Sequence, residues 1–279
     1  MVSVIVPVYN CEKYICKAVD SALAQAVPME IIVIDDCSSD NSLRVLVKHL
    51  KETYSITDKK RLQDNSDGQS NRKYRLLWQY SLQGSTITFV RCKKNKGVAY
   101  TRNLGVRLSK GEYVAFLDSD DWWAKDKLKK QLEVMEKYDA VLCNTSRELY
   151  LADGTNTGIC IDTPLVITYK MLTRTNYINC SSVLVRRDVI FKYAMIDRGC
   201  HEDYLTWLRI LRDYGWVVGI NEPLLNYRLS RDGKSRNKLK SAMMTYRTYR
   251  MAGYGSLRAL FMMFPYTYYG IFKYIKDRQ

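Results

Sequence analysis

Residues Glu112 to Trp123 read EYVAFLDSDDWW and join a short apolar segment to a group of acids. The apolar part, Tyr113 to Leu117, carries aromatic and aliphatic side chains in a short run, which predicts a buried strand. Three carboxylates, Asp118, Asp120 and Asp121, follow directly. In open α/β sheets, ligands bind outside the carboxyl ends of the strands. The sequence therefore predicts a polar site where this strand ends.

The spacing of Asp118 and Asp120 suits a metal site. Two carboxylates at i and i+2 can converge on one hard divalent cation, which takes oxygen ligands and often keeps room for substrate phosphates. We therefore expect Mg²⁺ or Mn²⁺ and a diphosphate here. A solvated acidic turn is the alternative for an isolated Asp-x-Asp pair.

The preceding segments alternate between strand and helix patterns. Val2 to Val8 predicts a first strand, and apolar residues from Tyr14 to Leu23 recur at helical spacing, with Asn10 as the expected N-cap. Glu30 to Ile34 predicts a second strand, again followed by acids, Asp35 and Asp36. This order predicts a doubly wound α/β sheet covered by helices. The sequence contains neither G-x-G-x-x-G after the first strand nor a Walker A motif.

Later segments add less regular structure. Residues 56–85 are polar and aperiodic, and we expect a surface insertion there. Glu148 to Ile161 predicts a hairpin around Asp153-Gly154. Two separate final strands are expected at Trp216 to Ile220 and Leu225 to Leu229, after an amphipathic helix that begins behind His201-Glu202-Asp203.

Composition limits the cellular setting. The 279-residue chain carries a net charge of +15, and twelve Lys and Arg residues against two acids lie from Arg228 onward. The eight cysteines form no C-x-x-C pair, the N-terminus resembles a strand more than a signal peptide, and no apolar stretch is long enough to span a bilayer. We expect a cytoplasmic protein with anionic partners.

Five segments together resemble a known family. They are SVIVPVYN, VIDDCSSDNS, NKGVAYTRNLG, EYVAFLDSDDWW and HEDYLTWLRI, in the order and spacing of the family 2 inverting glycosyltransferases. The resemblance implies the GT-A fold, a Rossmann-like and mostly parallel central sheet flanked by helices. It implies a catalytic domain over 1–229, with a nucleotide-binding half at 1–117 that contains the insertion and an acceptor-binding half at 118–229. Residues 230–279 form a C-terminal helical extension rich in aromatic and basic residues.

The resemblance also implies roles on the donor side. Pro7, Tyr9 and Asp36 resemble the nucleotide pocket, with Tyr9 against the base and Asp36 accepting from a ring N–H. Arg102 resembles a basic residue beside the diphosphate. Asp120 resembles the direct metal ligand, and Asp118 lies nearer the ribose or shares the metal. Without the motifs, core packing for Tyr9 and a helix-terminal acid for Asp36 are the simpler interpretations.

On the acceptor side, Asp203 matches the general base of the family's E-D motif. Glu202 would orient the acceptor or the base, and Trp122 could stack on a sugar ring. The structural alternatives are that the acids cap the following helix and that the tryptophan belongs to the core.

The C-terminal extension interleaves Met, Phe and Tyr with Arg and Lys. Its apolar run, Ala259 to Phe264, is too short to span a membrane, and Pro265 is expected to break it. Such a segment suits the interface of an anionic bilayer, and packing on the catalytic domain is the alternative. No RNA-binding module pattern is present, so we expect no nucleic acid partner.

Together these features predict a metal-dependent inverting glycosyltransferase. Its donor is a nucleotide-diphosphate sugar, with UDP favoured, and its acceptor a glycan hydroxyl on a polyprenyl diphosphate lipid, in surface polysaccharide synthesis. The protein is expected on the inner face of the cell membrane as a peripheral protein. The alternatives are a nucleotidyltransferase of related fold and an inactive family member that binds sugar or membrane.

Overall fold

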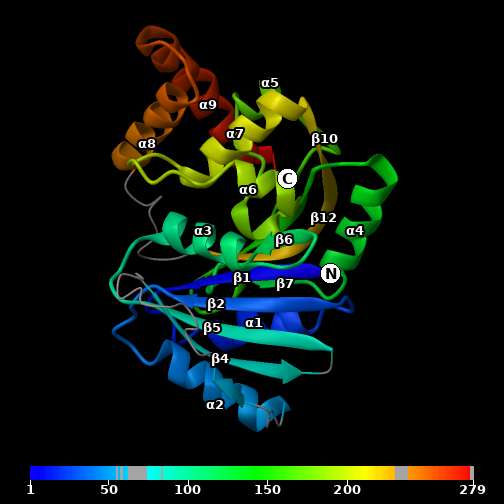
Figure 1. Cartoon of the computed structure of the whole chain (residues 1–279). Helices are drawn as coiled ribbons and strands as arrows, with labels where there is room; N and C mark the ends of the chain where they lie inside the picture. Colours follow the sequence, from blue (N-terminus) through cyan, green and yellow to red (C-terminus); the bar gives the residue numbers. More distant parts are fainter. Residues whose placement is uncertain (55, 57–58, 62–73, 83, 230–237, 277–279) are drawn as a thin grey trace.

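The computed structural model describes the chain except for residues 55, 57–58, 62–73, 83, 230–237 and 277–279 (Figure 1). Its strands and helices alternate from the first strand to the second helix, as the sequence predicts. The elements are, in chain order, β1 (Val2–Val8), α1 (Ile15–Leu23), β2 (Met29–Asp35), α2 (Ser42–Tyr54), β3 (Lys59–Arg61), β4 (Tyr74–Leu82), β5 (Ser85–Cys92), α3 (Val98–Leu108), β6 (Tyr113–Phe116), β7 (Trp122–Trp123), α4 (Lys127–Tyr138), β8 (Leu142–Tyr150), β9 (Asn156–Ile161), β10 (Val166–Thr168), α5 (Tyr169–Leu172), β11 (Leu184–Arg186), α6 (Arg187–Lys192), α7 (Glu202–Tyr214), β12 (Trp216–Arg228), α8 (Lys238–Met251) and α9 (Ser256–Lys276).

One sheet runs through the whole described structure, in the order β10-β12-β8-β11-β6-β1-β2-β5-β4-β3. Its centre, β6-β1-β2-β5, is parallel. The strands that flank this centre are joined mainly by antiparallel pairs, such as β11 with β6 and β4 with β5. The sheet is therefore parallel where the N-terminal α/β alternation predicts it and mixed toward both edges.

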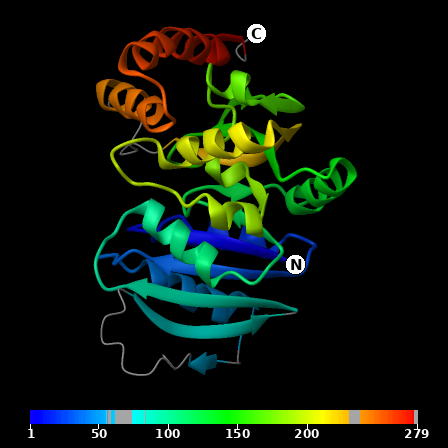
Figure 2. The ribbon, with the colours of Figure 1, turned by 45° about the horizontal axis from the view of Figure 1, so that its top comes forward.

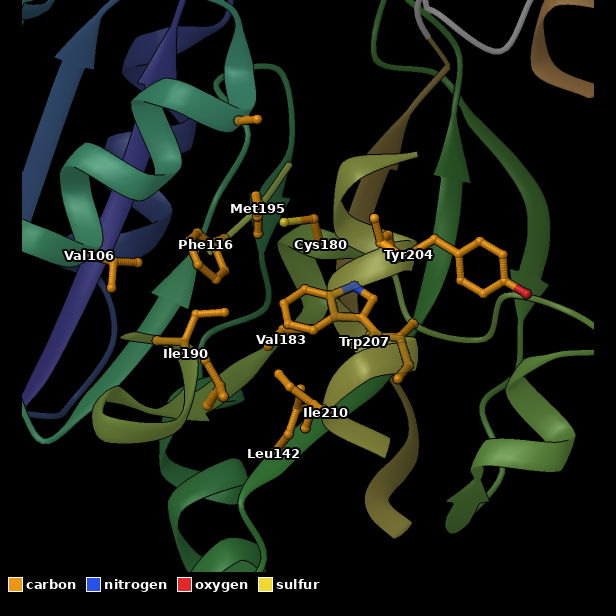
Figure 3. Close-up of a cluster of buried hydrophobic side chains, with 14 of the residues drawn as sticks. Val106, Phe116, Leu142, Cys180, Val183, Ile190, Met195, Tyr204, Trp207 and Ile210 are labelled. Atoms are coloured by element: carbon orange, nitrogen blue, oxygen red, sulfur yellow. The ribbon is translucent and has the colours of Figure 1, made fainter. Parts of the chain in front are cut away.

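Alternate side chains of the central strands feed two separate cores. Ile5 and Phe116 belong to the core on the face that α3 and α7 cover, whereas Val4 and Ala115 belong to the core on the other face. Because successive side chains of a strand point to opposite faces, a strand buried on both faces is apolar throughout. Figure 3 shows the first core, where Trp207 of α7 lies beside Phe116, with 6.4 Å between the ring centroids.

Gly105 sets the distance between α3 and the sheet. A Cβ at this position would lie 2.4 Å from Cγ2 of Ile5 in β1. Only glycine allows the helix to pack this closely on the strand. The close packing fixes α3, and with it Arg102, relative to the end of β1.

Three local expectations were wrong. The segment expected as a surface insertion contains β4, which pairs antiparallel with β5 and extends the sheet. The two expected final strands form one strand, β12, whose pairing with β8 shifts register around Pro223, since proline cannot donate to the ladder. Helix α1 begins after Tyr14 and not at Asn10, which instead accepts a hydrogen bond from the backbone N–H of Ser39 through its Oδ1 at 2.9 Å.

The C-terminal extension forms two helices, and α8 is part of the folded unit. Tyr249 of α8 is fully buried, and its hydroxyl donates to the carbonyl of Thr173 at 2.7 Å. Pro265, which follows the apolar run Ala259 to Phe264, lies inside α9. Figure 2 shows α8 and α9 together at the end of the molecule remote from β3 and β4. No helix within the described residues is both long and apolar enough to cross a bilayer.

Candidate active site

The three acids stand on a tight turn that follows β6. The backbone N–H of Asp121 donates to the carbonyl of Asp118 at 3.1 Å, which closes the turn. The N–H of Asp118 donates to Oγ of Ser181 at 3.1 Å. Ser181 therefore fixes the first acid from a segment that is distant in the sequence, and the motif alone gave no sign of this contact.

Arg228, at the end of β12, holds the other side of the turn. Its backbone N–H donates to Oδ1 of Asp121 and its Nε to the carbonyl of Asp120, both at 2.9 Å. A further guanidinium N–H donates to the carbonyl of Ala152 at 2.9 Å. The sequence placed Arg228 in a strand but not at the site, because the pairing that brings it there is long-range.

Arg102 connects the turn Asp118 to Asp121, which we call the acid turn, to α7. Its side chain is 5% exposed, and the guanidinium donates to Oδ1 of Asp118 at 2.6 Å and to Oε1 of Glu202 at 3.4 Å. Burial disfavours a charged guanidinium, yet the neighbouring carboxylates, Asp118 foremost, raise the pKa of Arg102 above its usual value. One buried cation thus joins two segments that the family resemblance assigns to donor and acceptor.

The other two acids of the turn, Asp120 and Asp121, are buried where ionisation is disfavoured. Burial, and then the charge of Asp118, raise the pKa of Asp120 from 3.8 to about 6. Burial, followed by the charges of Asp120 and Asp118, raises the pKa of Asp121 well above its usual value. Oδ2 of Asp121 is buried and has no hydrogen-bond partner among the described residues. Like charges packed at one strand end disfavour ionisation of each other.

This donor set fits a divalent cation in part. Within the described residues no group of three His, Cys, Asp or Glu side chains is arranged to enclose a metal ion. The turn does supply carboxylate oxygens and excess negative charge, which is the chemistry that Mg²⁺ and Mn²⁺ select. Mg²⁺ commonly takes one or two carboxylates and fills its remaining positions with water and substrate phosphates. The residues present therefore fit a cation shared with a diphosphate.

Asp203 lies at the start of α7, next to Glu202. Its Oδ1 accepts a hydrogen bond from the backbone N–H of Tyr204 at 2.8 Å. Burial and the adjacent charge of Glu202 raise the pKa of Asp203. The acids do lie in the first turn of a helix, as the structural alternative holds, but Glu202 is also bound to Arg102. Glu202 is thus connected to the acid turn through Arg102, and Asp203 is its neighbour in the chain.

A cavity of about 650 Å³ lies at the ends of β1 and β2, and residues 118–121 of the turn do not line it. Tyr9 lines it and is 50% exposed, so it is not a core residue. Asp36 also lines it, and its carboxylate accepts from the backbone N–H groups of Lys96 at 2.8 Å and Gly97 at 2.7 Å. Pro7 is buried in β1 and does not line the cavity. Its nucleotide role stays a prediction.

Trp122 is in contact with two cations and another aromatic ring. Nζ of Lys17 lies 3.4 Å from the centroid of the indole, and the guanidinium carbon of Arg228 lies 4.9 Å from it. The ring of Tyr150 packs edge-on, with 4.5 Å between the centroids. These contacts hold Trp122 against the residue that fixes the acid turn. Its proposed stacking on an acceptor stays a prediction.

The sheet is covered by helices on both faces, carries an acid turn at the end of β6, and has a cavity at the ends of β1 and β2. This is the architecture of an α/β enzyme with its site at the carboxyl ends of the strands. The sequence matches the model of the family described as "Glycosyl transferase family 2" over residues 3–74 and 65–205. Because this match covers more than half of the chain, the chain belongs to that family and is a glycosyltransferase. The alternative of a nucleotidyltransferase is thereby set aside.

Two curated relatives are similar over nearly their whole length. A Bacillus subtilis glycosyltransferase named for teichuronic acid biosynthesis, TuaG, is 34% identical over 251 residues, which cover 90% of this chain and 87% of that protein. The Escherichia coli enzyme WfaP is 28% identical over 98% of this chain and 95% of its own. Its name is UDP-Glc:alpha-D-GlcNAc-diphosphoundecaprenol beta-1,3-glucosyltransferase.

A solved structure identifies the fold. The mannosyltransferase PcManGT from Pyrobaculum calidifontis, in complex with GDP-Man and Mn²⁺, superposes with a TM-score of 0.62 at 16% identity. The superposition covers 94% of this chain and 69% of that one. The chain therefore has the GT-A fold, as the family resemblance implied.

The raised pKa of Asp120 predicts that its charge destabilises the metal-free fold at neutral pH. Because the pKa of Asp120 is higher in the folded than in the unfolded state, the free energy of unfolding falls as pH rises from 3.8 to about 6. Asp120→Asn should therefore raise the free energy of unfolding by about 3 kcal/mol at about pH 7.5 and by roughly a third of that at about pH 4.5. Urea unfolding in EDTA at the two pH values measures this difference.

Asp118→Asn provides the contrasting variant. It removes a carboxylate that is bound to Arg102, so it should bring no comparable gain in stability at either pH. An Asp120→Asn gain of the same size at both pH values would show that the charge of Asp120 is not the cause.

Proposed function

We propose that this glycosyltransferase moves a sugar from a nucleotide-diphosphate donor, UDP-sugar in the first instance, to a glycan hydroxyl with inversion at the anomeric carbon. The acceptor is carried on a polyprenyl diphosphate lipid, and the product belongs to a surface polysaccharide. The reaction depends on Mg²⁺ or Mn²⁺. The enzyme works at the inner face of the cell membrane as a peripheral protein.

One observation carries this proposal. Arg102 joins Asp118 of the acid turn to Glu202, the residue next to Asp203. A donor diphosphate near the acid turn and an acceptor hydroxyl near Asp203 would then meet across one buried guanidinium. Single displacement with inversion requires the attacking oxygen and the leaving diphosphate on opposite sides of the anomeric carbon, and binding sites held on either side of Arg102 are compatible with that requirement.

Asp203 is the proposed general base. The acceptor hydroxyl must lose its proton as its oxygen attacks, and a carboxylate within hydrogen-bond reach contributes typically about 10²- to 10⁴-fold to the rate. Burial and Glu202 raise the pKa of Asp203, which makes its carboxylate a stronger base. Oδ1 of Asp203 accepts a hydrogen bond from the backbone N–H of Tyr204. This bond orients the carboxylate and leaves Oδ2 for the acceptor hydroxyl.

The donor side needs a different chemistry. A bound divalent cation would neutralise the charge that develops on the departing diphosphate, and Asp120 and Asp118 are the residues that would hold it. Arg228 holds this turn through the carbonyl of Asp120 and the carboxylate of Asp121. Tyr9 and Asp36 would bind the base, by stacking and by accepting a ring N–H. GDP-Man and Mn²⁺ bound to PcManGT support a nucleotide sugar and a metal on this fold.

The lipid-linked acceptor and the membrane are supported by α9. Large apolar side chains project from one face of this helix at a spacing of three, four, seven and eleven residues and are more than half exposed: Leu257, Leu260, Phe261, Phe264 and Tyr268. We call this set the α9 stripe. An apolar stripe beside basic residues suits a helix that lies in the headgroup region of an anionic bilayer. The diphosphoundecaprenol substrate in the name of WfaP supports the same setting.

Asp203→Asn should abolish sugar transfer while metal-dependent UDP binding stays within about twofold of wild type, because the amide keeps the shape but cannot accept the proton. The two readouts are transfer to a lipid-linked acceptor and calorimetric titration with UDP and Mn²⁺.

The matched control is Asp213→Asn, on the same helix, whose side chain is 44% exposed. It should leave both readouts near wild type. If Asp203→Asn lost nucleotide binding as completely as transfer, Asp203 would be a structural residue and not the base.

The double variant Phe261→Glu/Phe264→Glu should weaken binding to phosphatidylglycerol-containing vesicles by at least about tenfold. It removes apolar area that the bilayer would bury, and it brings two negative charges to an anionic surface. Both rings are more than two thirds exposed, so folding should be unchanged. Vesicle co-sedimentation measures the binding, and circular dichroism checks the fold.

Phe191→Glu, on α6, is the control, because it replaces an exposed phenylalanine outside α9 by glutamate. It should leave vesicle binding near wild type. Point variants are preferred to deletion from Met243, since deletion would also remove the buried Thr248 and Tyr249. Unchanged vesicle binding by the α9 double variant would place the membrane contact elsewhere or exclude it.

A further inference from the structure

The cavity beside Tyr9 has two walls from opposite ends of the chain. Tyr9 and Asp36 form the wall at the ends of β1 and β2, and Met243 and Arg247 of α8 line the same cavity. A volume of about 650 Å³ lies within the usual range of small-molecule sites. The extension expected outside the catalytic domain thus lines the cavity that the proposed function assigns to the donor base.

Helix α8 is fixed to the catalytic domain on its other side. Oγ1 of Thr248 accepts the backbone N–H of His201 at 3.1 Å, and the imidazole Nε2 of His201 lies 3.3 Å from the carbonyl of Ser241. Tyr249 is fully buried, and its hydroxyl lies 3.3 Å from that of Tyr204. The backbone of α8 is therefore held on the catalytic domain by contacts that need no ligand, and it carries Met243 and Arg247 at the cavity wall.

Arg247 occupies space that a side chain at residue 199 would need. A Cβ on Gly199 would lie 2.5 Å from a guanidinium nitrogen of Arg247. Gly199 also has φ +67, in the left-handed region that disfavours other residues. The positive φ favours glycine at this position, and the absence of a Cβ leaves room for the guanidinium of Arg247 close to the backbone at the cavity wall.

The chemistry of this wall is selective. A guanidinium has five N–H donors and no acceptor, and the ammonium of Lys240 on the same wall also only donates. Guanine and thymine present carbonyl acceptors, as does uracil, whereas cytosine and adenine present an amino group at the corresponding position. The thioether of Met243 supplies a soft apolar surface for a ring. Arg247 and Lys240 therefore favour a base edge with carbonyl oxygens, whereas the carboxylates of Asp36 and Asp197, which also line the cavity, accept from N–H groups of a base.

We infer that α8 is the second wall of the donor-base site and that Arg247 is a specificity-determining residue that selects carbonyl-bearing bases. The inference rests on the proposed function, because it takes the cavity as the base site of a nucleotide donor. It assigns to the C-terminal extension a part in donor recognition that is separate from any contact with a membrane.

Nucleotide binding by wild type and Arg247→Gln measures the selectivity directly. Each nucleotide is titrated with Mn²⁺, and the four are compared in two pairs. UDP has a carbonyl where CDP has an amino group, and GDP has a carbonyl where ADP has an amino group. Wild type should bind the carbonyl member of its preferred pair at least about tenfold more tightly. Arg247→Gln should weaken that member about tenfold and leave the amino member no weaker, because a glutamine amide both donates and accepts.

Arg250→Gln is the matched control, since Arg250 is exposed on the same helix and donates to the carbonyl of Tyr254 outside the cavity. It should keep the wild-type ratio. Equal weakening of both members by Arg247→Gln, or no weakening, would overturn the inference while leaving nucleotide binding intact. Absence of binding of all four nucleotides to wild type would instead overturn the proposed function, and the inference with it.

Discussion

The buried guanidinium of Arg102 is the interaction on which the arrangement of the site depends. It is 5% exposed and binds Asp118 on one side and Glu202 on the other. Removing one partner from a buried ion pair leaves an uncompensated charge and typically costs about 3–5 kcal/mol. The close packing of α3 at Gly105 puts the guanidinium where both carboxylates reach it. The acid turn and the start of α7 are thus held by the same residue.

The acid turn illustrates the conflict between stability and function at such a site. Asp120 and Asp121 have raised pKa values because they are buried beside other carboxylates, and the fold tolerates this through contacts from Arg228. The same excess of negative charge is what a divalent cation and a diphosphate would use. Polar groups that are costly in the empty protein are often the groups that bind a ligand.

Local patterns predicted much of the centre of the structure, because buried parallel strands and strand-end acids are visible in the sequence alone. Asp118 and Asp120 were placed at the end of β6 from the apolar run before them. Contacts between distant segments were not predictable in this way. Arg228 reaches the turn only through the pairing of β12, whose register shifts at Pro223, and Arg247 reaches the cavity only because α8 packs on the catalytic domain.

Calorimetric titration of UDP into the purified protein, with and without Mn²⁺, tests the central claim most directly. If the acid turn holds a metal shared with the donor diphosphate, UDP should bind tightly only with Mn²⁺, and Asp120→Ala should remove the metal-dependent part of the affinity. UDP binding that is the same with and without Mn²⁺, or that Asp120→Ala leaves unchanged, would contradict the account.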